Sequence, residues 1–131
     1  MATFIGTAES DVLVGTFRRD ELFGESGDDV LLGSRGPDIL DGGGDDDVLD
    51  GGVGGDQMTA GGGDDVIVAS WGSDTVDGGP GSDLYIVHGR NRDTVTVSDG
   101  GGEADTLDFS RARRGGTIDL EAGATSEVDG R

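Results

Sequence analysis

Aspartate recurs every nine residues between positions 11 and 83 of the chain. The series comprises Asp11, Asp20, Asp29, Asp38, Asp47, Asp56, Asp65, Asp74 and Asp83. Carboxylates either exchange protons or bind cations, and a formal net charge of −19 makes cations the natural partners of this chain. The same charge argues against nucleic acid, which is itself a polyanion. One histidine and no cysteine exclude a structural zinc site.

The aspartates belong to a repeat of nine residues that runs from Gly6 to Ile86 without insertion or deletion. Position one is glycine or alanine, position six is aspartate, and position eight is apolar in every repeat. Glycine reaches positive φ without steric cost, so the first six positions suit a turn. The last three positions suit a very short strand whose middle residue alone faces inward. We therefore predict turns that carry the aspartates and strands that carry one core residue each.

The overall composition is that of a disordered chain. There are 28 glycines among 131 residues, and only 32% of the residues are apolar. So little apolar surface offsets only a small part of the chain entropy, and we expect the metal-free chain to be unfolded. No apolar stretch reaches membrane-spanning length, and the N-terminus lacks the features of a secretory signal peptide.

The repeat GGxGxDxUx, in which U is apolar, resembles the nonapeptide of RTX (repeats-in-toxin) proteins. The resemblance implies an all-β fold, a right-handed parallel β-roll in which two repeats complete one coil. Residues 1–86 would form this roll. Residues 87–131 hold two degenerate repeats, 88–96 and 100–108, and would form a short β cap. The stretch from residue 105 onward is also similar to the segment adjoining the roll in serralysin-type secreted metalloproteases.

The resemblance also implies that calcium lies between repeats two units apart, whose aspartates are eighteen residues apart. Calcium takes six to eight hard oxygen ligands in an irregular cage. Carboxylates and turn carbonyls therefore suit calcium better than they suit magnesium or softer metals. In the family, each ion takes the carbonyls at positions two and four and the aspartate of one repeat. It then takes the carbonyls at positions one and three and the aspartate of the repeat two units later.

Carried over to this chain, the family pattern implies five sites. On the edge formed by the odd-numbered repeats they are Glu25, Gly27 and Asp29 with Gly42, Gly44 and Asp47; Gly43, Asp45 and Asp47 with Ala60, Gly62 and Asp65; and Gly61, Gly63 and Asp65 with Gly78, Pro80 and Asp83. On the edge formed by the even-numbered repeats they are Ser34, Gly36 and Asp38 with Gly51, Val53 and Asp56; and Gly52, Gly54 and Asp56 with Ala69, Trp71 and Asp74.

Two further pairings, Asp11 with Asp29 and Asp20 with Asp38, bring the expected number to about five to seven ions. The first two repeats carry Glu9 or the pair Arg18 and Arg19 at turn positions. These repeats could therefore form an N-terminal cap instead of binding sites. The side chains of Asp45 and Asp46 lie outside the ligand position, and we expect them to be solvated.

The outward-facing positions of the two sheets differ in polarity. They are mostly apolar in the odd-numbered repeats, as at Val12, Val30 and Val48, and mostly polar in the even-numbered repeats. We expect the apolar face to be covered by residues 94–97, 106–109 and 117–120, by another domain, or by a second copy of the chain. The strand propensity of valine is the alternative explanation. Phe17 and Trp71, at turn position three, are expected to be exposed.

The function implied by the resemblance is that of a calcium-binding folding module rather than an enzyme. Such a chain is unfolded at low cytoplasmic calcium, leaves the bacterium through a type I secretion channel, and folds outside the cell at millimolar calcium. The alternative is a non-catalytic C-terminal fragment of a serralysin-like metalloprotease or of another RTX enzyme or toxin. The chain has no HExxH motif. Exported RTX proteins carry a secretion signal at the extreme C-terminus, whereas this sequence stops at SEVDGR, so we expect it to be a fragment or a truncated product.

Two other classes fit the sequence less well. The chain has enough acidic residues to form a glycosidase-like catalytic pair. However, the aspartates follow the repeat, and we expect no large apolar pocket that could raise the pKa of a catalytic acid. An adhesive or ice-binding roll would carry regular threonine or asparagine ladders on one outer face, and the sequence has none.

Overall fold

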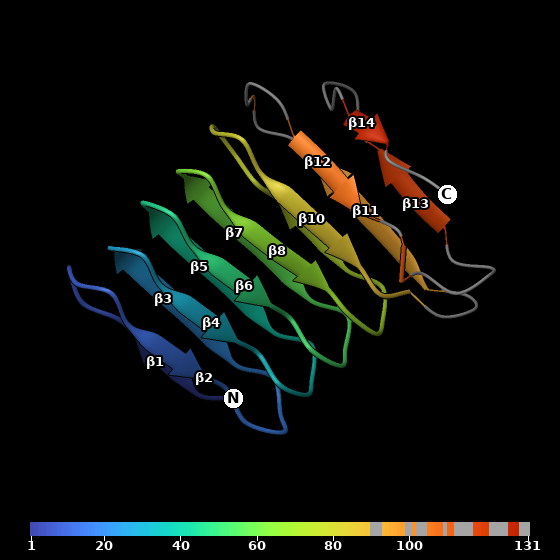
Figure 1. Ribbon diagram of the computed structural model, residues 1–131. Helices are drawn as coiled ribbons and strands as arrows, with labels where there is room; N and C mark the ends of the chain where they lie inside the picture. The colour runs from blue at the N-terminus through green and yellow to red at the C-terminus, as the bar shows by residue number, and fades with distance from the viewer. Residues whose placement is uncertain are drawn as a thin grey trace.

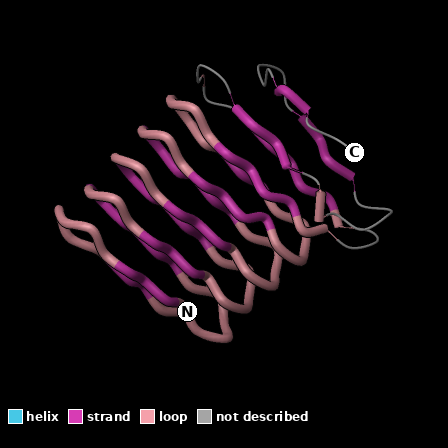
Figure 2. Tube along the Cα trace, in the orientation of Figure 1, coloured by secondary structure: helices cyan, strands magenta, loops and turns pink. Residues whose placement is uncertain are grey.

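The computed structural model describes residues 1–89, 93–98, 101, 105–108 and 110–111, and the strand backbone of 117–120 and 126–128. The described residues form short strands joined by turns (Figure 1, Figure 2). The strands are β1 (Thr3–Ile5), β2 (Val12–Val14), β3 (Glu21–Ser26), β4 (Val30–Leu32), β5 (Ile39–Gly44), β6 (Val48–Asp50), β7 (Gln57–Gly62), β8 (Val66–Ala69), β9 (Thr75–Asp77), β10 (Leu84–Val87), β11 (Thr94–Ser98), β12 (Asp105–Asp108), β13 (Thr117–Leu120) and β14 (Ser126–Val128). Within this described part, no helix is long and apolar enough to span a membrane.

The strands form two parallel sheets, and successive strands alternate between them. One sheet has the order β1-β3-β5-β7-β9-β11-β13 and the other the order β14-β12-β10-β8-β6-β4-β2. The even-numbered repeats supply β3, β5, β7 and β9, and the odd-numbered repeats supply β2, β4, β6, β8 and β10. Leu22 pairs with Leu40, and Leu31 pairs with Leu49, eighteen residues further on. Two repeats therefore complete one coil of a parallel β-roll, as predicted.

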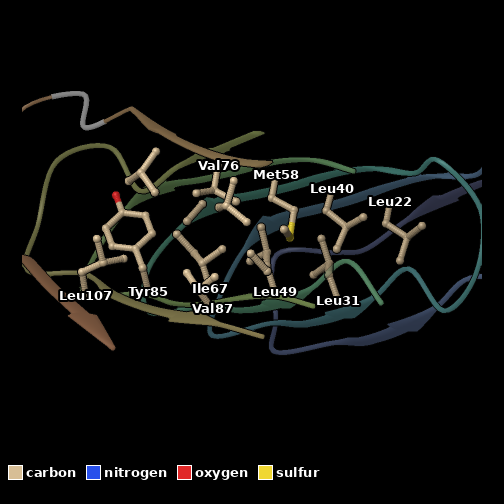
Figure 3. Packing of buried hydrophobic residues seen from close by; sticks show 14 residues of the cluster. Leu22, Leu31, Leu40, Leu49, Met58, Ile67, Val76, Tyr85, Val87 and Leu107 are labelled. Carbon is tan, nitrogen blue, oxygen red and sulfur yellow. The ribbon is translucent and has the colours of Figure 1, made fainter. Parts of the chain in front are cut away.

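Position eight of the repeats fills the interior between the sheets, which Figure 3 shows as a line of apolar side chains. Its fully enclosed members are Leu22, Leu31, Leu40, Leu49, Met58, Ile67, Val76 and Tyr85, each at most 3% exposed. Side chains alternate between the two faces of a strand, so a strand of three residues can bury only its middle one. At the open end of the roll, Phe4 and Leu13 are only partly buried.

Within the nine repeats, five strands are longer than the three residues predicted: β8 and β10 have four residues, and β3, β5 and β7 have six. β3, β5 and β7 each continue into the first turn positions of the next odd-numbered repeat, where Glu25 pairs with Gly43 and Gly43 with Gly61. Turns of equal length keep their backbone groups in register from coil to coil, so the ladder of hydrogen bonds continues into them. On the opposite edge only position three pairs, from Arg35 to Val53 and from Val53 to Trp71.

The C-terminal strands extend the two sheets and do not lie over the apolar face. β11 and β13 join the even-repeat sheet, and β12 and β14 join the odd-repeat sheet. The prediction that residues 94–97, 106–109 and 117–120 cover the apolar face is therefore wrong, although residue 109 itself lies outside the described residues. The edges of β9 and β10 offer unpaired backbone groups, which a further strand satisfies and a sheet face does not. On the apolar face, Val12 is 68% exposed and Val48 is 36% exposed.

The degenerate repeats continue the coil but lose the spacing of eighteen residues. Leu107 pairs with Tyr85, as position eight of repeat 100–108 predicts. Val97 pairs with Val76, whereas repeat 88–96 places Val95 at position eight, so that register is wrong by two residues. Val95 and Val97 are both buried. Because residues two apart point to the same face of a strand, hydrophobic burial alone does not select between the two registers.

Candidate metal centre

The aspartates at position six form two buried files, one along each edge of the roll. From Asp20 to Asp83 each is at most 1% exposed. Along both files, the backbone amide of one aspartate donates to Oδ1 of the aspartate one coil further on, at 2.7 to 3.0 Å. In the odd-repeat file this continues to Asp105, whose Oδ1 accepts from the amide of Asp83 at 2.8 Å. One carboxylate oxygen of each aspartate thus links two coils.

The second carboxylate oxygen has no such donor in the middle of the roll. The buried Oδ2 atoms that accept no hydrogen bond include those of Asp29, Asp38, Asp47, Asp56, Asp65 and Asp74. A buried anionic oxygen without a donor is costly unless a cation or a proton compensates it. These atoms are hard oxygen donors, and they fit calcium by their chemistry.

Burial raises the pKa of these carboxyl groups. Removal from water is the largest cause, and the amide donated to Oδ1 offsets part of it. The pKa rises to about 7 for Asp47 and Asp56 and to about 6 for Asp74. The pKa values of Asp38 and Asp65 are raised as well, again chiefly by burial. The fold therefore places carboxylates where a bound cation would relieve an unfavourable charge.

The first two repeats satisfy their own aspartates. The amide and hydroxyl of Thr7 donate to Oδ2 of Asp11 at 2.6 and 2.8 Å. Those of Thr16 donate to Oδ2 of Asp20, both at 2.6 Å. The Thr16 hydroxyl is the main reason that the pKa of Asp20 is lowered. This geometry favours the N-terminal cap over binding sites in these two repeats.

From the third repeat onward, most residues at turn positions two and four adopt left-handed backbone conformations, and Gly54 and Ser70 are the exceptions. Three of them are not glycine: Glu25 has φ 81°, Ser34 has φ 80°, and Asp45 has φ 75°. Each such residue costs about 1–3 kcal/mol and persists only where the surrounding structure holds it in place. The alternation of φ along the turn makes successive carbonyls point in opposite directions.

Carbonyls at positions two and four face the following coil, and those at positions one and three face the preceding coil. At position two, Ser34 accepts from the amide of Val53 at 3.0 Å. At position three, Val53 in turn accepts from the amide of Gly36 at 2.9 Å. At position one, the carbonyl of Gly51 lies 2.6 Å from where a Cβ on Gly33 would be, and at position four that of Gly36 faces Gly54.

The same gap between coils therefore receives the four carbonyls and the carboxylates expected as ligands. The described residues hold no group of three or more histidine or acidic side chains that could bind a metal by themselves. In this structure the carbonyls at positions two and three, such as those of Ser34 and Val53, accept from backbone amides of the neighbouring coil, and each retains a second lone pair. Ala69 is the exception among the expected ligands, because its carbonyl accepts from the amide of His88 in the following coil.

Sequence reasoning missed a second file of carboxylates on the odd-repeat edge. Asp28, Asp46 and Asp64, all exposed, occupy position five. Oδ1 of Asp28 accepts from the amide of Asp46 at 3.1 Å, and Oδ1 of Asp46 accepts from the amide of Asp64 at 2.8 Å. Asp46 is thus exposed as predicted, but it is also ordered. The signal was available, since position five is acidic in three odd-numbered repeats and in none of the even-numbered ones. Asp105 was also missed, although it is position six of repeat 100–108.

Carboxylate and carbonyl oxygens that could bind a cation recur between the coils. They define the class of this protein, a cation-binding parallel β-roll built from nonapeptides. A comparison with protein families gives the particular family. The family model of the RTX calcium-binding nonapeptide repeat (4 copies) matches residues 5–40, 23–58 and 51–85. The chain belongs to this family, whose repeats bind calcium. Searches of curated proteins and of solved structures give no match.

Proposed function

We propose that this calcium-binding β-roll folds when it binds about five calcium ions outside the cell, as part of a bacterial protein exported by a type I system. The single observation that carries the proposal is the set of buried Oδ2 atoms without donors, of which Asp47 and Asp65 are examples. Calcium supplies the positive charge that these oxygens lack.

The ligand sets implied by the family pattern gain support from the directions of the turn carbonyls. Between residues 33–38 and 51–56, the carbonyls of Ser34, Gly36, Gly51 and Val53 all face the gap that Asp56 enters from the following coil. We assign calcium to this gap and to the four others of the same pattern, with Ala69 removed from its set. Asp11 and Asp20 are assigned to the N-terminal cap because Thr7 and Thr16 satisfy them.

Coupling between calcium and folding follows from the charge on the chain. A net charge of −19 favours an extended chain, and the raised pKa values of Asp47 and Asp56 mean that the coil opposes ionised carboxylates at neutral pH. Low cytoplasmic calcium then keeps the chain extended for export. Millimolar calcium outside the cell compensates the carboxylates, and the repeats can close into coils.

The test is a calcium titration of the whole chain followed by circular dichroism and by calorimetry. We expect the β-sheet signal to rise with calcium and not with magnesium, with about five ions bound per chain. Asp47→Asn removes one charge shared by two gaps and should abolish about two of these sites. Asp108→Asn, which removes a carboxylate on β12, is the matched control. An unchanged β signal between zero and about 10 mM calcium would reject the proposal.

A further inference from the structure

The exposed charges of the two edges are opposite in sign. At turn positions one to five, the charged residues of the odd-numbered repeats are all acidic: Glu9, Glu25, Asp28, Asp45, Asp46 and Asp64. The charged residues of the even-numbered repeats at these positions are all arginines: Arg18, Arg19 and Arg35. All nine side chains are exposed. The edges therefore differ in the electrostatic potential that an approaching cation meets.

The position-five carboxylates of the odd-repeat edge point across the gap toward the following coil. Oδ1 of Asp46 lies 3.0 Å from where a Cβ on Gly63 would be, and the carbonyl of Asp45 faces the same place. One coil further, Oδ1 of Asp64 lies 3.4 Å from the corresponding point on Gly81, which the carbonyl of Gly63 also faces. Each outer carboxylate thus accompanies a position-four carbonyl that the calcium assignment already uses.

Buried carboxylates reach into the same gaps from the other side. Asp47 and Asp65 each send Oδ1 back toward the preceding coil, and each has a buried Oδ2 without a hydrogen-bond donor. Two files of carboxylates therefore face one another across the odd-repeat gaps.

The even-repeat edge has one file only. Its position five is Arg19, Pro37, Gly55 and Ser73 in successive repeats. The backbone of Arg18 and Arg19 lies against Gly36, with the Arg18 carbonyl 2.8 Å from where a Cβ on Gly36 would be. Cations at this edge meet buried aspartates alone, with arginines beside the first gap.

We propose that the two edges form two classes of calcium site and load in sequence, the odd-repeat edge at the lower calcium concentration. Asp28 and Asp46 hold the ions of that edge together with the buried aspartates. The inference rests on the proposed function. A unit charge at about 6 Å from a divalent ion in water changes its affinity about tenfold at low salt.

Each edge can carry its own fluorescent reporter. Trp71, the only tryptophan, lies at position three of the even-repeat edge and is 45% exposed. Gly44 is the equivalent position on the odd-repeat edge, and a Cβ there would meet no atom within 4 Å. The double variant Trp71→Phe/Gly44→Trp therefore moves the reporter to the odd-repeat edge with little steric cost.

Calcium titrations of the two reporter proteins test the order of loading. We expect the odd-repeat reporter to respond at a calcium concentration several-fold lower than Trp71 does. Adding Asp28→Asn and Asp46→Asn should raise the odd-repeat midpoint about tenfold. The pair Glu21→Gln and Asp108→Asn, which removes the same charge from strands β3 and β12, should leave it within twofold.

The possible results separate this inference from the proposed function. Coincident midpoints, or a lower midpoint for Trp71, overturn sequential loading even when calcium induces the β signal. Separate midpoints that the Asp28→Asn/Asp46→Asn pair leaves unchanged overturn the role of the outer carboxylates. No calcium response in circular dichroism overturns the proposed function itself. Gly55→Asp, which places a carboxylate at position five of the other edge, should lower the Trp71 midpoint.

Discussion

Thr16 donates two hydrogen bonds to one oxygen of Asp20, from its amide and its hydroxyl, both at 2.6 Å. In the middle of the roll the equivalent oxygen of Asp38 and Asp56 is buried and accepts none. The same position of the repeat is therefore satisfied by the chain at one end and left without a hydrogen-bond donor further along. In our proposal this contrast distinguishes the cap from the calcium sites.

Thr16→Val removes the hydroxyl donor and keeps the shape of the side chain. We expect the calcium-loaded roll to lose about 1–2 kcal/mol of unfolding free energy, and the pKa of Asp20 to rise from its lowered value. Denaturant unfolding in saturating calcium measures the first, and a titration of the Asp20 carboxyl by NMR measures the second. Thr75→Val, at an exposed position of β9, is the control and should change stability by less than about 0.5 kcal/mol. Equal effects of the two variants would contradict the cap.

Acid should order the metal-free chain. The pKa of Asp47 and Asp56 is about 7 in the coil, against about 3.9 in an unfolded chain. Raised values mean that the coil binds protons more tightly, so this stability is complete below about pH 4 and is lost as the pH rises through about 6 to 7. In chelator, circular dichroism should show β signal growing from pH 8 to pH 4.5.

Calcium should reverse this dependence, because it competes with protons for the same carboxylates. We expect the calcium midpoint to rise as the pH falls from 7 to 5, and calcium binding at pH 6.5 to release protons into a weak buffer. Light scattering must stay flat, since the sequence pI is about 4.1. A metal-free chain that stays unordered at pH 4.5 would show that the buried carboxylates do not control folding.

Leu49→Ala should destabilise the calcium-loaded roll by about 2–5 kcal/mol. Leu49 is fully buried in the single apolar line between the sheets, and neighbouring turns limit how far the coil can collapse around the cavity. Val12→Ala, on the exposed face, should cost much less. Denaturant midpoints at saturating calcium compare the two, and a similar loss for Val12→Ala would indicate that the outer apolar face is covered in solution.

Gly72→Ala tests the close approach of successive turns. Gly72 has φ +139°, and a Cβ there would overlap the carbonyl of Gly54 in the preceding coil. We expect a loss of about 1–3 kcal/mol, together with weaker calcium binding at the gap between these turns. Gly44→Ala is the matched control, because its Cβ meets no atom within 4 Å, and it should be neutral. Thermal unfolding at fixed calcium distinguishes them, and equal melting temperatures would contradict the stacking of the turns.

The nine-residue period determined the core positions and the phase of the aspartates without any tertiary information, and the resemblance to RTX repeats supplied the coil of two repeats. A strand of three residues can bury only its middle one, so Leu31 and Leu49 had to face inward. Equal repeat lengths keep every coil in register, so in a coil of two repeats the aspartates of alternate repeats had to stack. These features depend on local conformation repeated at constant spacing, which a sequence displays directly.

Only the tertiary structure decided which oxygens lack a donor, where the last strands go, and how the edges differ. Thr16 donates to Asp20 through the path of its turn. Val97 rather than Val95 pairs with Val76, a choice that hydrophobic burial cannot make because both registers bury the same face of the strand. Strands 94–98 and 105–108 join the sheets because leaving the backbone groups of β9 and β10 unpaired would cost more free energy than leaving the valine face exposed. Such choices depend on competition between contacts of distant residues, and the repeat period carries no information about that competition.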